Sequence, residues 1–313
     1  MQAIMVDEPG GPDVLRMAEA AMPEPGPEDV LVRVLAAGVG PWDAARRSGQ
    51  MPGSFPYIPG LEFSGVVEGN TGDAAAFEDG EPVYGYRWPD GCYAEYVACP
   101  AEQLAPLPTG LDPDEAAAVP VCGLTALQGL ASELGVGSGD TVLITAAAGG
   151  VGHLAVQIAR ILGASVIATA SPQNHEFLHT LGAELVVDHT QQDWPEQVRS
   201  LSGGGVTKAL ATAAPTLAGA AASTREGGVV ATAVHADYPQ SAGVRWQPYD
   251  SRPSGSDLIR MAPWFDDGSL QVHVSRRFYW KDAVAAQREI EHGHIQGKLL
   301  LIVDDDLAAQ MQV

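Results

Sequence analysis

Apolar and polar residues follow two different patterns along the chain, and the change falls near residue 120. Before it, short runs with apolar residues are separated by Gly and Pro, which predicts strands joined by turns. After it, continuous apolar runs alternate with stretches of helical period, which predicts buried parallel strands joined by helices. The expected strands are Gln2–Val6, Val30–Leu35, Phe63–Val67, Tyr93–Ala98, Thr141–Thr145, Ser165–Thr169, Glu184–Val187, Lys208–Thr212, Gly228–Ala233 and Gly243–Gln247.

The end of the chain has a pattern of apolar runs and turns similar to that of its beginning. A loop rich in Pro, Ser and Gly precedes an expected helix, after which strands and a helix alternate. We therefore expect two domains, one formed by residues 1–120 together with 253–313 and the other by 121–252. The elements expected after the loop are a helix at Ser256–Phe265, a strand at Leu270–Val274, a helix at Lys281–Glu291 and a strand at Lys298–Val303.

A glycine-rich turn lies between the strand Thr141–Thr145 and a helix with a regular apolar stripe. The turn reads Ala146-Ala147-Ala148-Gly149-Gly150-Val151-Gly152, and the next strand begins at Ser165. A strand, glycine turn, helix and strand in this order are typical of dinucleotide binding, because the backbone approaches a pyrophosphate at the helix N-terminus. The apolar stripe of the helix consists of Val151, Leu154, Ala155, Ile158, Ala159 and Leu162.

Charge and cysteine content narrow the possible partners. The chain has 17 basic and 39 acidic residues, a formal charge of −22, which argues against nucleic acid as a partner. Its three cysteines are scattered, which argues against a disulfide framework and fits a reducing cytoplasm. We see neither a membrane-length apolar run nor a secretory signal, so we expect a cytoplasmic protein without a membrane partner.

Short motifs in a fixed order cover nearly the whole chain. Together they resemble the medium-chain dehydrogenase/reductase superfamily, in its zinc-free quinone oxidoreductase branch. The resemblance implies an α/β fold, with a GroES-like β-barrel domain built from both chain ends and a Rossmann domain with a doubly wound parallel sheet. Besides the glycine turn, the motifs are Ala37-Gly38-Val39-Gly40-Pro41-Trp42-Asp43, Pro59-Gly60-Leu61-Glu62-Phe63-Ser64-Gly65, Gly91-Cys92-Tyr93-Ala94-Glu95-Tyr96-Val97, Gly123-Leu124-Thr125-Ala126, Leu181-Gly182-Ala183-Glu184, Asp282-Ala283-Val284-Ala285-Ala286 and Gly297-Lys298-Leu299-Leu300-Leu301.

The same resemblance also indicates whether this chain has the residues that bind zinc. Zinc-using relatives hold the ion with an early Cys, a Gly-His-Glu motif and a four-Cys lobe, whereas this chain has Gly40 near the first position and Leu61 in place of the His. Thiolate and imidazole are the ligands that zinc requires, so we expect no metal. The segment His175–His179 matches a zinc-protease pattern, but it opens the helix after the second Rossmann strand, and we assign it no metal.

The residues after the second Rossmann strand indicate which cofactor is used. An acid at this place binds the ribose 2′-hydroxyl of NADH, and residues 170–175 contain none. Ser171 and Asn174 can donate hydrogen bonds to a 2′-phosphate, so NADPH is the expected cofactor. The alternative is that both side chains only cap the helix. We expect cofactor contacts from Ala148, Gly149, Gly150, Val151, Ala170, Ser171 and Asn174, and the resemblance adds Thr125, His189, Ala233, Val234 and His235.

The expected chemistry is direct hydride transfer to a small-molecule substrate, a quinone or an activated C=C bond, because such an acceptor spreads the incoming charge onto oxygen. No residue is assigned as a catalytic acid or base. A redox-silent NADPH-binding protein, similar to crystallin-like relatives, and an alcohol dehydrogenase remain alternatives. A homodimer is expected through the strand Gly243–Gln247, which should lie at a sheet edge. The expected substrate pocket consists of Pro41, Trp42, Asp43, Tyr57 and Tyr86.

Overall fold

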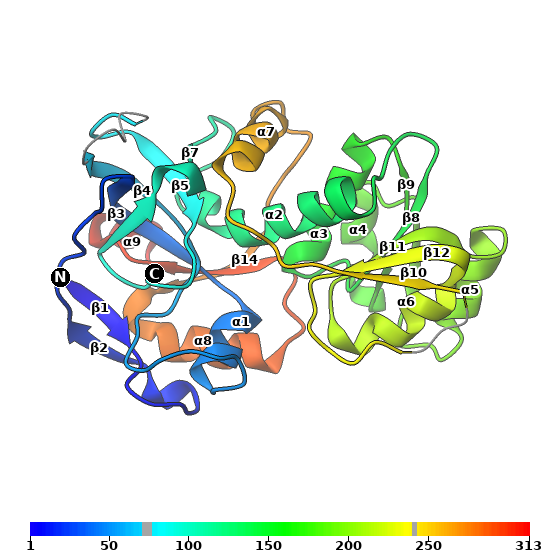
Figure 1. Ribbon diagram of the computed structural model, residues 1–313, viewed down its shortest axis with the longest axis horizontal. Helices are drawn as coiled ribbons and strands as arrows, with labels where there is room; N and C mark the ends of the chain where they lie inside the picture. The colour runs from blue at the N-terminus through cyan, green and yellow to red at the C-terminus, as the bar shows by residue number, and fades with distance from the viewer. Residues whose placement is uncertain (71–76, 240–242) are drawn as a thin grey trace. The chain divides into compact units, whose positions relative to one another are not determined.

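The computed structural model describes residues 1–70, 77–239 and 243–313. The chain divides into two compact units (Figure 1). The first contains Met1–Val121, Pro253–Gly268 and Val272–Val313, and the second contains Cys122–Arg252 and Ser269–Gln271. The first unit is therefore assembled from both ends of the chain, and the short segment Ser269–Gln271 belongs to the second unit.

The first unit is built on a seven-stranded sheet in which β6 pairs with β3 and the others follow the order β14-β15-β3-β4-β5-β7. A separate antiparallel pair, β1 and β2, lies at the start of the chain. The strands are β1 (Gln2–Met5), β2 (Arg16–Glu19), β3 (Asp29–Val39), β4 (Glu62–Asn70), β5 (Pro82–Tyr86), β6 (Tyr96–Pro100), β7 (Leu104–Pro106), β14 (Val274–Tyr279) and β15 (Lys298–Ile302), and the helices are α1 (Pro41–Arg47), α7 (Gly255–Asp266), α8 (Ala283–His292) and α9 (Asp305–Met311).

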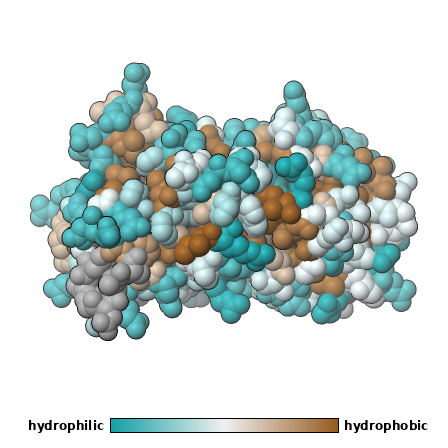
Figure 2. Space-filling view, turned by 90° about the horizontal axis from the view of Figure 1, so that it is seen from above, coloured by the Kyte–Doolittle hydropathy of each residue, from teal (hydrophilic) through white to brown (hydrophobic). Residues whose placement is uncertain are grey.

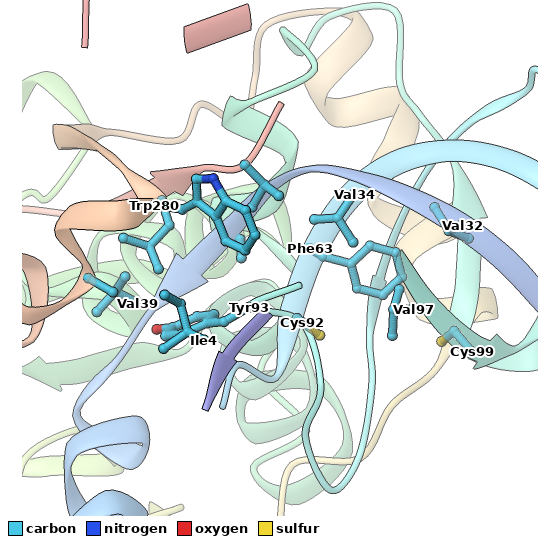
Figure 3. Packing of buried hydrophobic residues seen from close by; sticks show 14 of the residues in the cluster. Ile4, Val32, Val34, Val39, Phe63, Cys92, Tyr93, Val97, Cys99 and Trp280 are labelled. Atoms are coloured by element: carbon cyan, nitrogen blue, oxygen red, sulfur yellow. The ribbon is translucent and has the colours of Figure 1, made fainter. Parts of the chain in front are cut away.

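The strand β3 organises the core of this unit. Its first half alternates between buried and half-buried residues, as expected for a strand with one face in the core, and its last four residues are all buried. Figure 3 shows Val32 and Val34 of β3 beside Phe63, and Val39 near Tyr93 and Trp280. Residues from the first third and from the end of the sequence thus share one apolar core, and α1 begins directly after β3.

The second unit contains a six-stranded parallel sheet in the order β10-β9-β8-β11-β12-β13. Its central strands are buried along almost their whole length, which is typical of a sheet covered on both faces. The strands are β8 (Thr141–Thr145), β9 (Ser165–Ala170), β10 (Leu185–Asp188), β11 (Val206–Ala211), β12 (Thr224–Thr232) and β13 (Arg245–Pro248), and the helices are α2 (Pro120–Leu127, which begins in the first unit), α3 (Gly150–Ile161), α4 (His175–Thr180), α5 (Trp194–Leu201) and α6 (Leu217–Ser223).

Helices cover both faces of this sheet, as the right-handed rule for parallel crossovers requires. In Figure 1, α3 and α4 lie on one face and α5 and α6 on the other. Val198 of α5 and Leu217 of α6 pack in one cluster with Leu143 and Val230 from the sheet. The predicted doubly wound parallel sheet is confirmed, as is the edge position of its last strand, β13. Pairing of that edge with a second copy stays a prediction.

The prediction of a strand at Leu270–Val274 is wrong. The strand β14 begins at Val274 and runs to Tyr279. The reason lies in the hydrogen bonds of Gln271, whose backbone N–H and C=O both pair with the Gln157 side chain, at 2.9 and 2.8 Å. Because a side chain satisfies these groups, residue 271 has no need of a partner strand. The other expected strands are present with ends that differ by a few residues.

Figure 2 shows a face that is largely hydrophilic, with hydrophobic residues gathered in separate small groups. Among the helices that the structure describes, none combines the length and the apolar character needed to cross a bilayer.

Candidate functional site

The glycine-rich turn of the second unit follows β8 and leads into α3. Ala146 occupies the first position of the turn with a φ of 47°, a left-handed conformation that normally favours glycine. Gly149 is the N-cap of α3, and none of the side chains that the structure describes caps this helix end. The first N–H groups of α3 are therefore not satisfied by a capping side chain and can bind a negatively charged group.

Gly152 allows the close approach of α3 to this turn. A Cβ at residue 152 would lie 2.5 Å from the Ala146 carbonyl oxygen and 2.6 Å from the Ala147 Cα. Both neighbours are backbone atoms, which cannot rotate away. The structure thus assigns the three positions of the turn different tasks: a left-handed bend at Ala146, an uncapped helix start at Gly149, and helix packing at Gly152.

The end of β9 brings together Ser171 and two histidines from different elements. The His175 Nε2 atom lies 3.2 Å from the Ala170 carbonyl oxygen, and the His189 N–H donates to the same oxygen at 3.4 Å. The Ser171 hydroxyl lies 3.4 Å from His189 Nε2. Neither Ser171 nor Asn174 makes a side-chain capping bond to the helix it precedes. The alternative that both serve only as helix caps therefore finds no support in these contacts.

The other expected cofactor residues of this unit lie at helix or strand ends. Thr125 is buried in α2 and its carbonyl accepts from the Tyr249 hydroxyl at 2.8 Å. Ala233 and Val234 follow β12, and His235 pairs with Asp250 at 2.9 Å in an exposed position. Sequence reasoning missed a hydroxyl cluster at the carboxyl ends of β8 and β11. The Thr145 and Thr216 hydroxyls lie 2.6 Å apart, and the Thr212 hydroxyl donates to the Thr145 backbone carbonyl at 2.7 Å.

The first unit contains a shallow depression beside α1 that is partly open to solvent. Of the expected pocket residues, Trp42, Asp43 and Tyr57 line it, whereas Pro41 and Tyr86 do not. The Tyr57 hydroxyl is buried without a hydrogen-bond partner among the described residues. Sequence reasoning missed the other lining residues, which are Arg46, Met51, Gly60, Leu61, Trp88, Pro89 and Asp90.

The Trp42 indole fills the space beside Gly40. A Cβ at residue 40 would lie 2.2 Å from two ring carbons of Trp42, so any larger residue at position 40 would displace the indole. The Lys298 ammonium lies 4.9 Å from the centre of the ring, within the range of a cation–π contact. Gly40 and Lys298 together therefore fix the position of Trp42 in the wall of the depression.

Lys298 is itself held by a buried ion pair. Its ammonium donates to Glu62 Oε1 at 2.5 Å and to the Val39 carbonyl at 3.1 Å. The second carboxylate oxygen of Glu62 accepts from the Val121 N–H at 2.8 Å. The side chain of Glu62 is fully buried and that of Lys298 is 3% exposed. Both residues stand in motifs of the sequence, but no sequence signal showed that they form a pair.

Asp43 is a second buried carboxyl near this pair. Its Oδ2 atom accepts from the Gly40 N–H at 2.9 Å and from the Tyr93 hydroxyl at 3.2 Å. Burial raises the pKa of the Asp43 carboxyl to about 7, although the Gly40 N–H and the Lys298 ammonium act in the opposite direction. In the folded protein the Asp43 carboxyl therefore changes its protonation state near neutral pH.

We expect the stability of the protein to depend on pH through Asp43. In the unfolded chain an aspartate ionises near pH 4, whereas the folded state keeps the Asp43 proton up to about pH 7. The folded state therefore loses stability relative to the unfolded state as pH rises from about 4 to 7, by on the order of 4 kcal/mol, and the loss levels off above that. Urea unfolding at pH 5 and pH 8 measures it.

The control is Asp43→Asn, which keeps an oxygen acceptor for the Gly40 N–H and does not titrate. As pH rises, the unfolding free energy of the wild type should fall relative to that of this variant. Parallel profiles for the two proteins would show that Asp43 does not titrate abnormally.

The positions at which zinc-using relatives hold their ion carry no ligating side chain here. Gly40 has no side chain and its space holds the Trp42 indole, while the apolar Leu61 lines the depression. In the second unit, His175 and His179 contact two different carbonyls, those of Ala170 and Ala183. Within residues 1–70, 77–239 and 243–313, no group of three or more potential ligands gathers in one place.

Two family models match the chain. Residues 26–109 match the alcohol dehydrogenase GroES-like domain, and residues 150–236 match the zinc-binding dehydrogenase domain. This pair defines a dehydrogenase of the medium-chain class. The quinone oxidoreductase of Homo sapiens is 34% identical over 207 residues, a match that covers 65% of this chain and 63% of the human protein.

Solved structures extend the likeness to the full length. A quinone oxidoreductase from Coxiella burnetii is 30% identical, with a TM-score of 0.86 over 97% of this chain and 99% of that one. A mycobacterial protein complexed with NADPH is 31% identical, with a TM-score of 0.86 over 97% and 100%. An NAD-dependent alcohol dehydrogenase is 32% identical with the same TM-score and coverage. The chain belongs to the medium-chain dehydrogenase/reductase superfamily, in its quinone oxidoreductase branch.

The second unit fits the nicotinamide cofactors that this family uses. The uncapped start of α3 suits a pyrophosphate, and the close packing at Gly152 keeps the turn in place beneath it. The Thr169 hydroxyl, at the end of β9, is buried without a partner among the described residues. The residues present therefore match the group that the fold implies.

Proposed function

We propose that this protein is an NADPH-dependent, zinc-independent reductase that transfers a hydride to a quinone or to the activated C=C bond of an enone. The observation that carries the proposal is the wall of the depression in the first unit. Aromatic Trp42 and Tyr57 and apolar Leu61 line it together with Asp43 and the Arg46–Asp90 ion pair, and among the described residues no thiolate or imidazole does. Such a wall suits a flat acceptor that carries its own electron sink.

The chain itself supplies binding and orientation. When bound, the nicotinamide supplies the hydride. Trp42 offers an aromatic face, held by Gly40 and Lys298, against which a planar ring or enone can stack. The buried Tyr57 hydroxyl lies in the same wall and can donate to a carbonyl oxygen on which negative charge develops. Alcohol oxidation would require a group that stabilises an alkoxide, which zinc provides in related enzymes.

NADPH is proposed over NADH because of the end of β9. Residues 170–175 contain no acid, the Ser171 hydroxyl lies 3.4 Å from His189 Nε2, and His175 Nε2 lies 3.2 Å from the neighbouring Ala170 carbonyl oxygen. A neighbouring structure complexed with NADPH agrees with this choice.

The function is tested by following NADPH oxidation with a quinone, an enone and a simple ketone, together with NADP-dependent oxidation of primary and secondary alcohols. Turnover of the quinone or the enone, in protein stripped of metal by a chelator, supports the proposal. Alcohol oxidation alone would instead indicate an alcohol dehydrogenase, and NADPH binding without any turnover would indicate a redox-silent binding protein.

We expect Trp42→Ala to raise the KM for the preferred acceptor about tenfold or more, because a stacked aromatic contributes roughly 1.5–3 kcal/mol. NADPH affinity should stay within about twofold, since Trp42 lies in the first unit and the nucleotide turn in the second. Steady-state kinetics and a direct NADPH titration measure the two effects separately.

Two further variants make this test specific. Gly40→Ala should raise KM as well, because the added Cβ occupies the place of the indole. Pro41→Ala, at an exposed residue outside the depression, should change nothing. A KM that is unaffected in Trp42→Ala would remove this residue from the acceptor site.

A further inference from the structure

Trp88 is a large apolar side chain that stays exposed at the depression of the first unit. It lies in the loop between β5 and β6, and it is 51% exposed. It is also one of the residues that line the depression. The other exposed large hydrophobic residues that the structure describes lie outside the depression, and they are Met22, Leu201, Ile259 and Val313. An indole in this place is available to a ligand, because covering its apolar surface is favourable.

The loop that carries Trp88 is held by its own neighbours. The Arg87 N–H donates to the Leu61 carbonyl at 2.7 Å. The Arg87 guanidinium donates to the carbonyl of Ala98 at 3.0 Å and to that of Asp90. The backbone on either side of Trp88 is therefore fixed, although the indole itself is exposed. A side chain presented from a fixed backbone loses less freedom when a ligand binds to it.

An ion pair between Arg46 and Asp90 joins this loop to α1. Arg46 Nε lies 2.9 Å from Asp90 Oδ1, and the two side chains are only 14% and 12% exposed. The same guanidinium lies 4.9 Å from the centre of the buried Tyr57 ring. Trp42 precedes Arg46 by four residues in α1, and residues at this spacing lie on one face of a helix. The pair therefore ties the segment that carries Trp42 to the segment that carries Trp88.

We infer that Trp88 is a specificity-determining residue, which binds an apolar extension of the acceptor while Trp42 contacts the reacting quinone or enone group. The inference rests on the proposed function and adds its substrate class, which is acceptors with an aryl or alkyl substituent beyond the reacting group. An indole offers a flat apolar surface to either kind of substituent. Arg46 and Asp90 act through the loop and are positioning residues.

The test compares three enones that are the same methyl ketone with a methyl, a pentyl or a phenyl group on the β-carbon. The quantity measured is the ratio of kcat/KM for the pentyl or phenyl enone to kcat/KM for the methyl enone, at saturating NADPH. Trp88→Ala should lower this ratio about tenfold, because the extension loses its apolar contact. Trp88→Phe should keep most of it. A general loss of folding or of NADPH affinity lowers all three values alike and leaves the ratio unchanged.

The two kinds of extension are distinguished by the same data. A fall confined to the phenyl enone would identify an aryl extension as the group that Trp88 binds, and a fall confined to the pentyl enone an alkyl chain. Asp90→Ala should lower the affected ratio about threefold or more, because the loop is then no longer tied to α1. An unchanged ratio in Asp90→Ala would overturn the positioning role of the ion pair.

The matched control is Ile259→Ala, which truncates a side chain of α7 that is 54% exposed and lies outside the depression. Its ratio should equal that of the wild type. An unchanged ratio in Trp88→Ala, in a protein that reduces all three enones, would overturn the inference and leave the proposed function intact. NADPH binding without turnover of any enone or quinone would instead overturn the proposed function, and the inference with it.

Discussion

Lys298→Met should destabilise the first unit by about 3–5 kcal/mol, the cost of leaving one member of a buried ion pair without its partner. Glu62 is fully buried, and apart from Lys298 its carboxylate accepts only the Val121 N–H among the bonds described. Removing the ammonium would therefore leave a charge in an apolar core or force Glu62 to take up a proton. Denaturant unfolding of the full chain, with fluorescence and far-UV circular dichroism as separate probes, measures the loss.

Two comparisons make the result specific to the buried pair. In the double variant Glu62→Gln/Lys298→Met, much of the lost stability should return, because no unpaired charge is buried. Lys208→Met removes a pair with Asp140 of similar length, 2.7 Å, whose side chains are about one quarter exposed. Its cost should stay below about 1 kcal/mol. Equal losses in Lys208→Met and Lys298→Met would show that burial does not control the effect.

The second large effect is expected for Gly152→Ala. The new methyl group would meet two backbone atoms of the turn at 2.5 and 2.6 Å, so α3 or the turn must move. Overpacking of this kind costs about 1–3 kcal/mol. NADPH binding should weaken at least tenfold, because the shift displaces the N–H groups at the start of α3. Thermal unfolding and NADPH titration measure the two losses.

Gly149→Ala separates binding from stability. A Cβ at residue 149 would meet only the Ala146 carbonyl oxygen, at 3.4 Å, and the residue has a φ of −78°, which alanine adopts without strain. Stability should therefore change by less than about 0.5 kcal/mol. Affinity for NADPH should still fall, because the second glycine of the motif lets the backbone approach the pyrophosphate. Unchanged affinity in Gly149→Ala and Gly152→Ala alike would place the cofactor elsewhere.

Much of the second unit could be predicted from the sequence because its signals are local. Buried parallel strands read as short apolar runs, and the glycine turn has its meaning only between a strand and a helix, both of which are visible in sequence. The prediction of a strand at Leu270–Val274 is wrong because a contact with a residue distant in sequence decides the conformation there. Its residues have a strand-like pattern, but Gln157, more than a hundred residues earlier, satisfies the backbone of Gln271.

The sequence by itself determined the family, the nucleotide turn and the absence of the usual zinc ligands from two motifs, since each depends on residues that are neighbours in the chain. Only the tertiary structure decided how the wall of the depression is made. Glu62 and Lys298 are 236 positions apart, and their ion pair holds the indole of Trp42 in the space that Gly40 leaves. Likewise, His175 and His189 meet at Ala170 only because β9 and β10 pair in the sheet. Such contacts are set by packing between distant segments, which no local pattern encodes.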